Sequence, residues 1–274
     1  MTLVLSQLCL CTIVKNEIDN ESGGIIQYCH QILPYLKYAI IIDTGSTDQT
    51  FQALQELQSH SSKFYHNLNF HVRRSVHPKF MGFAQARNES LEWAWKLFGS
   101  QEHHEQPSHI LILDADERLT IDQLNLIDKT LNVISNSDTS VSHRCDCSDV
   151  QFHESCLKFS IQCFNRLNDP VARSNSGLLN PRIFPFNSKF RFINQISNIR
   201  FERLVFDNKP LPRCYLASSS FYPIHIILHH YILNSSQRRK KNEWYKQLKS
   251  DDCIDQIQET ITNSIADQLE SVHI

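Results

Sequence analysis

The feature that most constrains the fold is an alternation of short apolar runs with longer amphipathic segments over the first 120 residues. Apolar runs typical of buried strands lie at 8–14, 38–42 and 110–113, and helical patterns lie at 23–33, 51–57 and 83–98. Strands that alternate with helices in this way form βαβ units, with parallel strands in one sheet and helices on its faces. The sequence therefore predicts an α/β fold with a mostly parallel sheet.

Two aspartates directly follow the third apolar run, in the segment from Ile110 to Arg118, which reads ILILDADER. A strand that ends here delivers Asp114 and Asp116 to the carboxyl edge of the sheet, where open α/β folds bind ligands. Carboxylate oxygens suit Mg²⁺ and Mn²⁺, so the pair suggests a divalent cation bridged to a phosphate. The alternative is a plain turn, because Asp is common in turns.

The second apolar run ends in a polar turn, Asp43 to Asp48, which precedes a helical pattern. Asp43 at the strand end is placed to accept a hydrogen bond from a base or a ribose, and Gly45 would supply a positive φ that other residues resist. Ser46, followed three residues later by Gln49, predicts a capping box at the helix start. An ordinary turn between a strand and a helix is the alternative.

One charged residue lies in line with the apolar stripe of the helical pattern at 83–98. Arg87 is four residues before the start of this stripe and therefore shares its face of the helix. The stripe consists of Leu91, Ala94, Trp95 and Phe98. A buried guanidinium needs an anionic partner, which an acidic strand end or a diphosphate would provide. A side chain that extends along the helix to solvent is the alternative.

Composition limits the partners and the compartment that fit this chain. Its 274 residues contain 27 Lys and Arg against 29 Asp and Glu, and the formal net charge of −2 argues against nucleic-acid binding. Nine cysteines are too dilute for a disulfide scaffold, and with no charged-then-apolar leader we expect a cytoplasmic protein. The apolar run at 221–233 is interrupted by Pro223 and is too short to span a bilayer.

Four segments, in this order, carry a family resemblance. They read LCTIVKNE at 10–17, DTGSTDQT at 43–50, FAQARN at 83–88 and LDADE at 113–117. In order and spacing they resemble four motifs of the family 2 glycosyltransferases, which have a GT-A fold. These motifs are the opening strand and turn, the DTGSTDGT segment, the FAxARN helix start and the DADE metal motif. The resemblance is strong over about the first 120 residues and weaker beyond them.

This resemblance implies a GT-A fold, which is a Rossmann-like mixed and mostly parallel sheet flanked by helices, here with a C-terminal helical extension. It implies transfer of a hexose from a nucleoside diphosphate sugar, with UDP as the default nucleotide, to a hydroxyl of a glycan, lipid or protein. Direct displacement would invert the configuration at the anomeric carbon of the sugar. A divalent cation, Mn²⁺ or Mg²⁺, and an arginine would neutralise the charge that develops on the leaving diphosphate.

The resemblance also implies roles for residues of the first half of the chain. Thr12, Glu17 and Asp43 would line the nucleoside pocket. Arg87 would approach the acidic edge and the diphosphate. The remaining two acids are Asp114, which would meet the ribose or the metal, and Asp116, which would bind the metal directly.

The second half offers a further metal ligand and a catalytic base that is harder to assign. His230 lies in a segment that resembles the family's HY region and would complete the metal shell, with His229 as the other candidate; a satisfied core histidine is the alternative. Where relatives often read GxVHE, this chain has the segment 194–198, so Asn198 stands where an acid is expected. An inverting transferase needs a carboxylate to accept the proton of the acceptor hydroxyl. Glu202 is the remaining candidate, and a solvated Glu at a strand end is the alternative.

We expect one GT-A domain at 1–233 followed by a helical extension at 234–274. The domain would consist of a nucleotide-sugar-binding half at 1–130, a polar insertion at 131–160 and an acceptor half at 161–233. The extension carries four basic residues from Arg238 to Lys241, which give at most a weak contact with a membrane surface or an anionic acceptor.

The polar insertion contains cysteines and histidines that could be drawn as a zinc site. They are His143, Cys145, Cys147, His153 and Cys156. Their spacing matches no common structural zinc pattern. We therefore favour a mobile loop that closes over donor or acceptor, with zinc as the alternative.

Two other functions fit parts of the sequence. A haloacid-dehalogenase-like phosphatase also has a DxD at a strand end, but that family places it on the first strand and wants Thr or Val where Arg118 stands. A non-catalytic sugar-nucleotide binder fits because Asn198 replaces the expected acid. The sequence leaves the oligomeric state open.

Overall fold

The structure is a computed structural model that describes most of the first 136 residues and parts of the remainder. The described residues are 5–19, 23–77, 82–100, 106–136, 160–165, 169–174, 182–195, 198–210, 227–232, 239 and 243. The chain divides into a unit Met1–Ile232 and a unit Leu233–Ile274. The insertion's histidines and cysteines at 143–156, and nearly all of the predicted C-terminal extension, lie outside the described residues.

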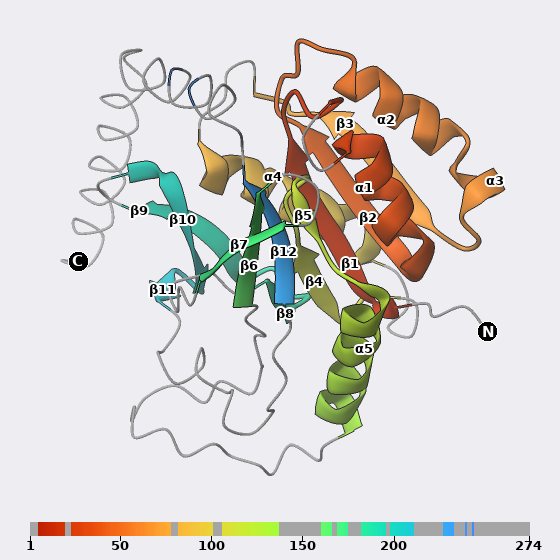
Figure 1. Ribbon diagram of the computed structural model, residues 1–274. Coiled ribbons are helices and arrows are strands. Elements are labelled where there is room, and N and C mark those ends of the chain that lie inside the picture. Colours follow the sequence, from red (N-terminus) through yellow and green to blue (C-terminus); the bar gives the residue numbers. More distant parts are fainter. Residues whose placement is uncertain are drawn as a thin grey trace. The chain divides into compact units, whose positions relative to one another are not determined.

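A five-stranded sheet forms the centre of the first unit (Figure 1). Its order is β3-β2-β1-β4-β8. The strands are β1 (Leu5–Val14), β2 (Leu36–Asp43), β3 (Asn69–Arg74), β4 (His109–Ile112) and β8 (Ile183–Pro185). The first four in this order run parallel, and β8 pairs antiparallel with β4. The predicted α/β class, with a mixed and mostly parallel sheet, is confirmed.

Two smaller sheets complete the described strands. One has the antiparallel order β11-β10-β9, from β9 (Phe190–Gln195), β10 (Asn198–Phe206) and β11 (Lys209–Pro210). The other has the order β5-β12-β6-β7, from β5 (Glu117–Arg118), β6 (Ser160–Asn165), β7 (Asp169–Ser174) and β12 (Ile227–Ile232). Through its pairing with β12, the short strand β5 joins the segment after β4 to the last described strand of the unit in sequence.

The described helices include all three that the sequence predicts, at 23–33, 51–57 and 83–98, and others that it does not. They are α1 (Gly24–Ile32), a 3₁₀ turn η1 (Leu33–Tyr35), α2 (Thr50–Ser59), α3 (Ser61–Phe64), α4 (Phe83–Phe98) and α5 (Ile121–Asn136). In α4, Trp95 of the predicted stripe is only partly buried, whereas the other three members are fully buried. Among the described residues, no helix has the length and apolar character that crossing a membrane requires.

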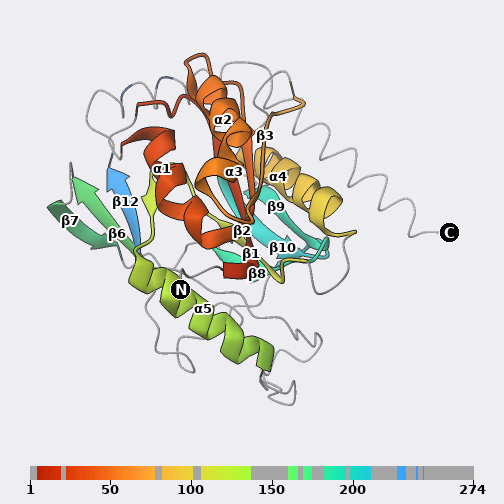
Figure 2. The same ribbon diagram turned by 90° about the vertical axis from the view of Figure 1, so that its right-hand side faces the viewer.

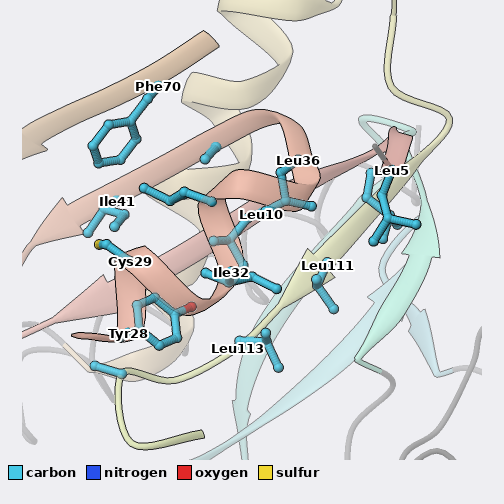
Figure 3. Close-up of a cluster of buried hydrophobic side chains, with 14 of the residues drawn as sticks. Leu5, Leu10, Tyr28, Cys29, Ile32, Leu36, Ile41, Phe70, Leu111 and Leu113 are labelled. Carbon is cyan, nitrogen blue, oxygen red and sulfur yellow. The ribbon is translucent and has the colours of Figure 1, made fainter. Parts of the chain in front are cut away.

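The period of two along β1 and β2 sorts their side chains into two cores, because both faces of the sheet are covered. Leu8 and Leu10 of β1 pack with α1, α2 and α5, as Figure 3 shows for part of this core. Cys9 and Cys11 face the other way and pack with α4, β9 and β10. Figure 2 shows α1 and α2 on one side of the sheet and α4 on the other. The fold is therefore layered about β1 and β2.

The predicted capping box at the start of α2 is wrong. Gln49 precedes the helix without a side-chain capping bond, and Ser46 Oγ instead accepts a hydrogen bond from the backbone N–H of Asn16 at 2.9 Å. Asp48 Oδ1 accepts from the Thr50 N–H at 2.9 Å in its place. Ser46, which the local sequence assigned to the helix start, is therefore bonded instead to Asn16 in the loop after β1.

Candidate functional site

The candidate residues lie at the carboxyl edge of the central sheet. Because β1, β2 and β4 are parallel, the loops that follow them leave from the same edge. In the register of these strands, Val14 pairs with Asp43, and Cys11 pairs with Ile112, two residues before Asp114. The predicted acids on β2 and after β4 therefore share one edge, with β1 between them.

Hydrogen bonds join the loop after β1 to the loop after β2. Asn16, with a positive φ of 56°, donates its N–H to Ser46 and accepts at Oδ1 from the Thr47 N–H at 2.8 Å. The Glu17 N–H donates to Thr50 Oγ1 at 2.8 Å. Glu17 is thus fixed next to the first turn of α2, and its predicted place in a nucleoside pocket stays a prediction.

Asp43 is fully buried at the end of β2. Its Oδ1 accepts hydrogen bonds from the backbone N–H groups of Gly45, at 3.0 Å, and Ser46, at 2.9 Å. Gly45 has the predicted positive φ, 99°. Asp43 Oδ2 is buried and accepts no hydrogen bond from the described residues. Burial lowers the pKa of the neighbouring Lys15, and the charge of Asp43 opposes that shift.

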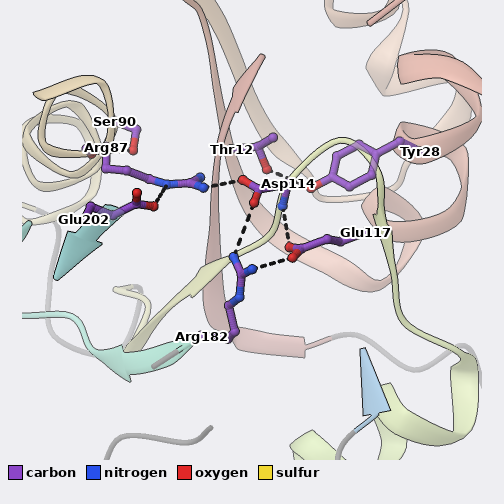
Figure 4. A network of polar contacts seen from close by, with 8 residues as sticks. All are labelled: Thr12, Tyr28, Arg87, Ser90, Asp114, Glu117, Arg182 and Glu202. Atoms are coloured by element: carbon purple, nitrogen blue, oxygen red, sulfur yellow. Dashed lines mark hydrogen bonds and ion pairs between the residues drawn. The ribbon is translucent and has the colours of Figure 1, made fainter. Parts of the chain in front are cut away.

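Arg87 joins two carboxylates from distant parts of the chain (Figure 4). Its side chain is 2% exposed. Nη2 forms an ion pair with Asp114 Oδ1, and Nε donates to Glu202 Oε1 at 3.4 Å. Burial acts to lower the pKa of Arg87, but Asp114 and Glu202 raise it above its ordinary value. The alternative of an arginine extended to solvent is therefore wrong.

Glu202 belongs to the same network, and the alternative of a solvated Glu at a strand end does not describe it. It lies within β10, is 17% exposed, and pairs across the antiparallel sheet with Asn194 of β9. Asn198, which stands where an acid was expected, begins β10 opposite Gln195, and its side chain is outside the described part. The role of Glu202 as the base stays a prediction.

Glu117, the last residue of the LDADE segment, and Arg182 are members of this network to which no role was assigned from the sequence. Arg182 Nη2 forms an ion pair with Glu117 Oε1, and its Nη1 lies 3.7 Å from Asp114 Oδ2. Glu117 Oε2 also accepts from the Asp114 N–H at 2.8 Å. Burial raises the pKa of Glu117, Arg182 lowers it, and the carboxylates of Asp114 and Asp116 raise it further. An arginine next to an apolar strand at 183–185 was the available sequence signal.

Thr12 is fully buried on β1. Its Oγ1 shares a hydrogen bond of 2.7 Å with the hydroxyl of Tyr28 in α1, visible in Figure 4. Burial raises the pKa of that Tyr28 hydroxyl, and the guanidinium of Arg118 lies 5.2 Å from the centre of the ring. Thr12 thus connects α1 to the central sheet, and its predicted contact with a nucleoside is a separate, untested expectation.

Glu89 is a buried acid of α4, on the side of β3. Its Oε1 accepts from Arg73 Nη2 at 3.0 Å and from the Val76 N–H at 2.9 Å, and its Oε2 accepts from Ser75 Oγ at 2.6 Å. The Ser75 N–H in turn donates to the carbonyl oxygen of Asp43 at 2.8 Å. Glu89 therefore fixes the segment after β3 beside the end of β2.

Asp116 and the histidines of β12 are the candidates for a divalent cation. Asp116 is partly buried after β4. In the antiparallel pairing of β12 with β5, His230 lies opposite Glu117 and His229 opposite Arg118. The side chains of both histidines lie outside the described ones. Asp116 lies in the turn directly before β5, and a carboxylate and an imidazole from these neighbouring segments suit Mn²⁺, so the donor chemistry fits. Among the described residues, no three His, Cys, Asp or Glu side chains are grouped to hold a metal.

The structure brings some of the predicted site residues into contact and keeps others apart. Arg87, Asp114 and Glu202 are in direct contact. Asp43 lies across β1 from this network, and its carboxylate accepts hydrogen bonds from its own turn. Glu17 lies with the loop after β2. The site is therefore a set of side chains along one sheet edge, with the arginine network at one end.

Comparisons with known proteins give only distant likenesses. No family model matches the sequence, and no curated protein matches it. The chain is similar to TarS of S. aureus at 15% identity and a TM-score of 0.40, over 66% of this chain and 28% of that one.

Two further solved structures are similar to a comparable degree. TarS 1–349 in complex with UDP has 15% identity, a TM-score of 0.38 and coverage of 66% and 47%. GalNAc-T7 with UDP, GalNAc and Mn²⁺ has 14% identity, a TM-score of 0.38 and coverage of 75% and 30%. The chain thus spans less than half the length of each, and likeness at this level assigns no family.

Proposed function

We propose that this protein is a glycosyltransferase of the GT-A type that transfers a hexose from a nucleoside diphosphate sugar to an acceptor hydroxyl. UDP is the expected nucleotide, and inversion is the expected stereochemistry. The observation that carries the proposal is that Arg87, Asp114 and Glu202, from three distant segments, meet at the carboxyl edge of the sheet. The resemblance of four sequence motifs to family 2 glycosyltransferases supports the same function.

Asp43 is the residue we propose for recognition of the nucleoside. A buried carboxylate oxygen without a hydrogen bond raises the free energy of the folded state. Asp43 Oδ2 is such an oxygen among the described residues. An N–H of a base or a hydroxyl of a ribose would satisfy it, once the nucleotide gains access to this buried oxygen. Thr12 and Glu17 would lie on the same side of the pocket.

The arginine network would act on the diphosphate and the acceptor. Arg87 carries a permanent positive charge next to the acidic edge, where it would stabilise charge on the departing diphosphate. Glu202 would accept the proton of the acceptor hydroxyl as general base. When bound at Asp116, with His230 as the candidate second ligand, a divalent cation would neutralise further charge on the leaving group.

A panel of nucleoside diphosphate sugars, with and without Mn²⁺, tests the proposal by thermal shift and by release of nucleoside diphosphate. We expect a UDP-sugar to raise the Tm, more so with Mn²⁺, because a ligand of the native state stabilises it. Asp43→Asn should weaken this shift. If no nucleoside diphosphate sugar changes the Tm of the folded protein, the proposed function is wrong.

Glu202→Gln separates catalysis from binding. The variant should keep donor binding but lower kcat by roughly 10²- to 10⁴-fold, the usual contribution of a general base. Glu92→Gln, at an exposed position of α4, is the matched control and should leave kcat unchanged. Equal kcat values in Glu202→Gln and the wild type would assign the base elsewhere.

The same panel distinguishes a second candidate function. The amide of Asn198 at the position of the expected acid favours a protein that binds sugar nucleotides without turnover. Donor binding with neither transfer nor donor hydrolysis, across a broad acceptor panel, would support that function. A phosphatase is disfavoured because both carboxylate oxygens of Asp114 face guanidinium groups. Turnover of an aryl phosphate that depends on Asp114 would reopen it.

A further inference from the structure

No role has been assigned to Arg182 so far, yet it contacts two acids of the candidate site. It directly precedes β8, and its carbonyl oxygen accepts from the Ile112 N–H at 2.8 Å, so its backbone is attached to β4. Its side chain is 13% exposed. From this fixed base its guanidinium reaches Glu117 and Asp114 (Figure 4).

The carboxylate of Asp114 is occupied by cations on both sides. Oδ1 is paired with Arg87, and Oδ2 faces Arg182 at 3.7 Å. A guanidinium stays charged at any pH that a protein tolerates. Although Asp114 is 36% exposed, a metal ion that approached it would therefore be repelled by two permanent positive charges.

The charge balance of this network gives Arg182 a second effect. Four carboxylates, those of Asp114, Asp116, Glu117 and Glu202, lie in or beside it, together with two guanidinium groups. Removal of one guanidinium would make the net charge of the network more negative. Such a site attracts a divalent cation more strongly, and the attraction is greater at the low effective dielectric of a partly buried position.

We propose that Arg182 is a positioning residue that acts as a tethered counter-ion, which keeps Asp114 and Glu117 from binding metal and leaves the divalent cation to Asp116. Asp114 is thereby held as a hydrogen-bond acceptor for the donor substrate. This inference rests on the proposed function, because the cation is the one expected for sugar-nucleotide transfer.

The test is a Mn²⁺ titration of the full chain without nucleotide, in which free Mn²⁺ is measured by electron paramagnetic resonance. Arg182→Gln should bind Mn²⁺ roughly tenfold more tightly than the wild type, because a nearby like charge is removed. Arg182→Lys keeps the charge and should stay near the wild type. Arg191→Gln removes the same charge from an exposed position of β9 and should have no effect.

A second pair of variants covers the case in which Arg182→Gln does not fold, because it leaves Glu117 buried without its partner. Glu117→Gln and the double variant Arg182→Gln/Glu117→Gln both lack that buried charge. The double variant should bind Mn²⁺ more tightly than Glu117→Gln. The comparison is made within a pair that folds, either the wild type with Arg182→Gln or Glu117→Gln with the double variant. The proposal is overturned if the member without Arg182 binds Mn²⁺ no more tightly than the other, or if neither member binds Mn²⁺.

The outcome is separable from that of the proposed function. Tighter Mn²⁺ binding by Arg182→Gln with no transferase activity in the wild type would support the counter-ion role and reject the function. Transferase activity in the wild type without tighter binding by the variant would reject the counter-ion role alone.

Discussion

Glu89 illustrates at the scale of one residue how a buried carboxylate is stabilised by its donors. It is 5% exposed and accepts hydrogen bonds from Arg73, Ser75 and Val76. Because these donors belong to β3 and the segment after it, the carboxylate is satisfied only in the folded chain. From the sequence alone, a glutamate at this position would be interpreted as a solvated residue on the polar face of an amphipathic helix.

Replacement of Glu89 by Gln should lower the free energy of unfolding by about 1–3 kcal/mol, because a charge-assisted acceptor is lost and one donor is left unsatisfied. Glu92→Gln, on the exposed face of the same helix, should change it by less than about 0.5 kcal/mol. Urea unfolding measures both. Equal effects of the two substitutions would show that the contacts of Glu89 contribute nothing to stability.

At the scale of elements, α4 connects three parts of the molecule through three consecutive residues. Successive side chains of a helix point about 100° apart, so neighbours in sequence reach different partners. Arg87 reaches Asp114 and Glu202, Asn88 reaches the backbone of β9, and Glu89 reaches the end of β3. One helix thus sets the positions of the network, the β9–β10 hairpin and the segment beside Asp43.

The contact of Asn88 with β9 uses both ends of the amide. Nδ2 donates to the carbonyl oxygen of Phe192 at 2.8 Å, and Oδ1 accepts from the Phe192 N–H at 2.7 Å. Asn88→Ala loses both bonds and should lower the free energy of unfolding by about 2 kcal/mol.

Asn88→Asp keeps the acceptor but places a carboxylate oxygen against the Phe192 carbonyl, so it should also destabilise. Chemical denaturation checks the series. If Asn88→Ala leaves the free energy of unfolding unchanged, water replaces the amide without loss of stability.

At the scale of the whole molecule, the dependence of stability on pH should carry a signature of His109. This residue is buried at the start of β4, and burial lowers its pKa from 6.5 to about 4. As the pH falls, His109 of the unfolded chain is therefore protonated near pH 6.5, whereas His109 of the native protein stays neutral until about pH 4. Stability is fully present above pH 6.5 and falls as the pH drops through this window, by about 3 kcal/mol in total.

His109→Gln removes this proton uptake, so its stability should fall less between pH 6.5 and pH 4 than that of the wild type. The difference between the two curves isolates His109, because Glu117, whose raised pKa acts in the opposite direction, is present in both. His66→Gln, at an exposed position, is the control. Parallel curves for His109→Gln and the wild type would contradict the prediction.

Local patterns predicted β1, β2, β4, α1, α2 and α4, but not β3, α3 or α5. The helical pattern at 83–98 coincides with α4, and the apolar runs at 8–14 and 38–42 lie within β1 and β2. These predictions succeed because the period of buried side chains is a local property of a helix or a strand. The capping box failed because Ser46 found a partner thirty residues away, which no local pattern encodes.

The sequence by itself determined the α/β class, the parallel direction of the predicted early strands and the placement of Asp43 and Asp114 at strand ends, since the period and composition of each segment fix them. Only the tertiary structure decided which charges meet. Arg182 lies 65 residues from Glu117, and Glu202 lies 115 residues from Arg87. Such pairs form because burial makes each charge costly until a partner from another element arrives, and that partner is chosen by how the elements pack.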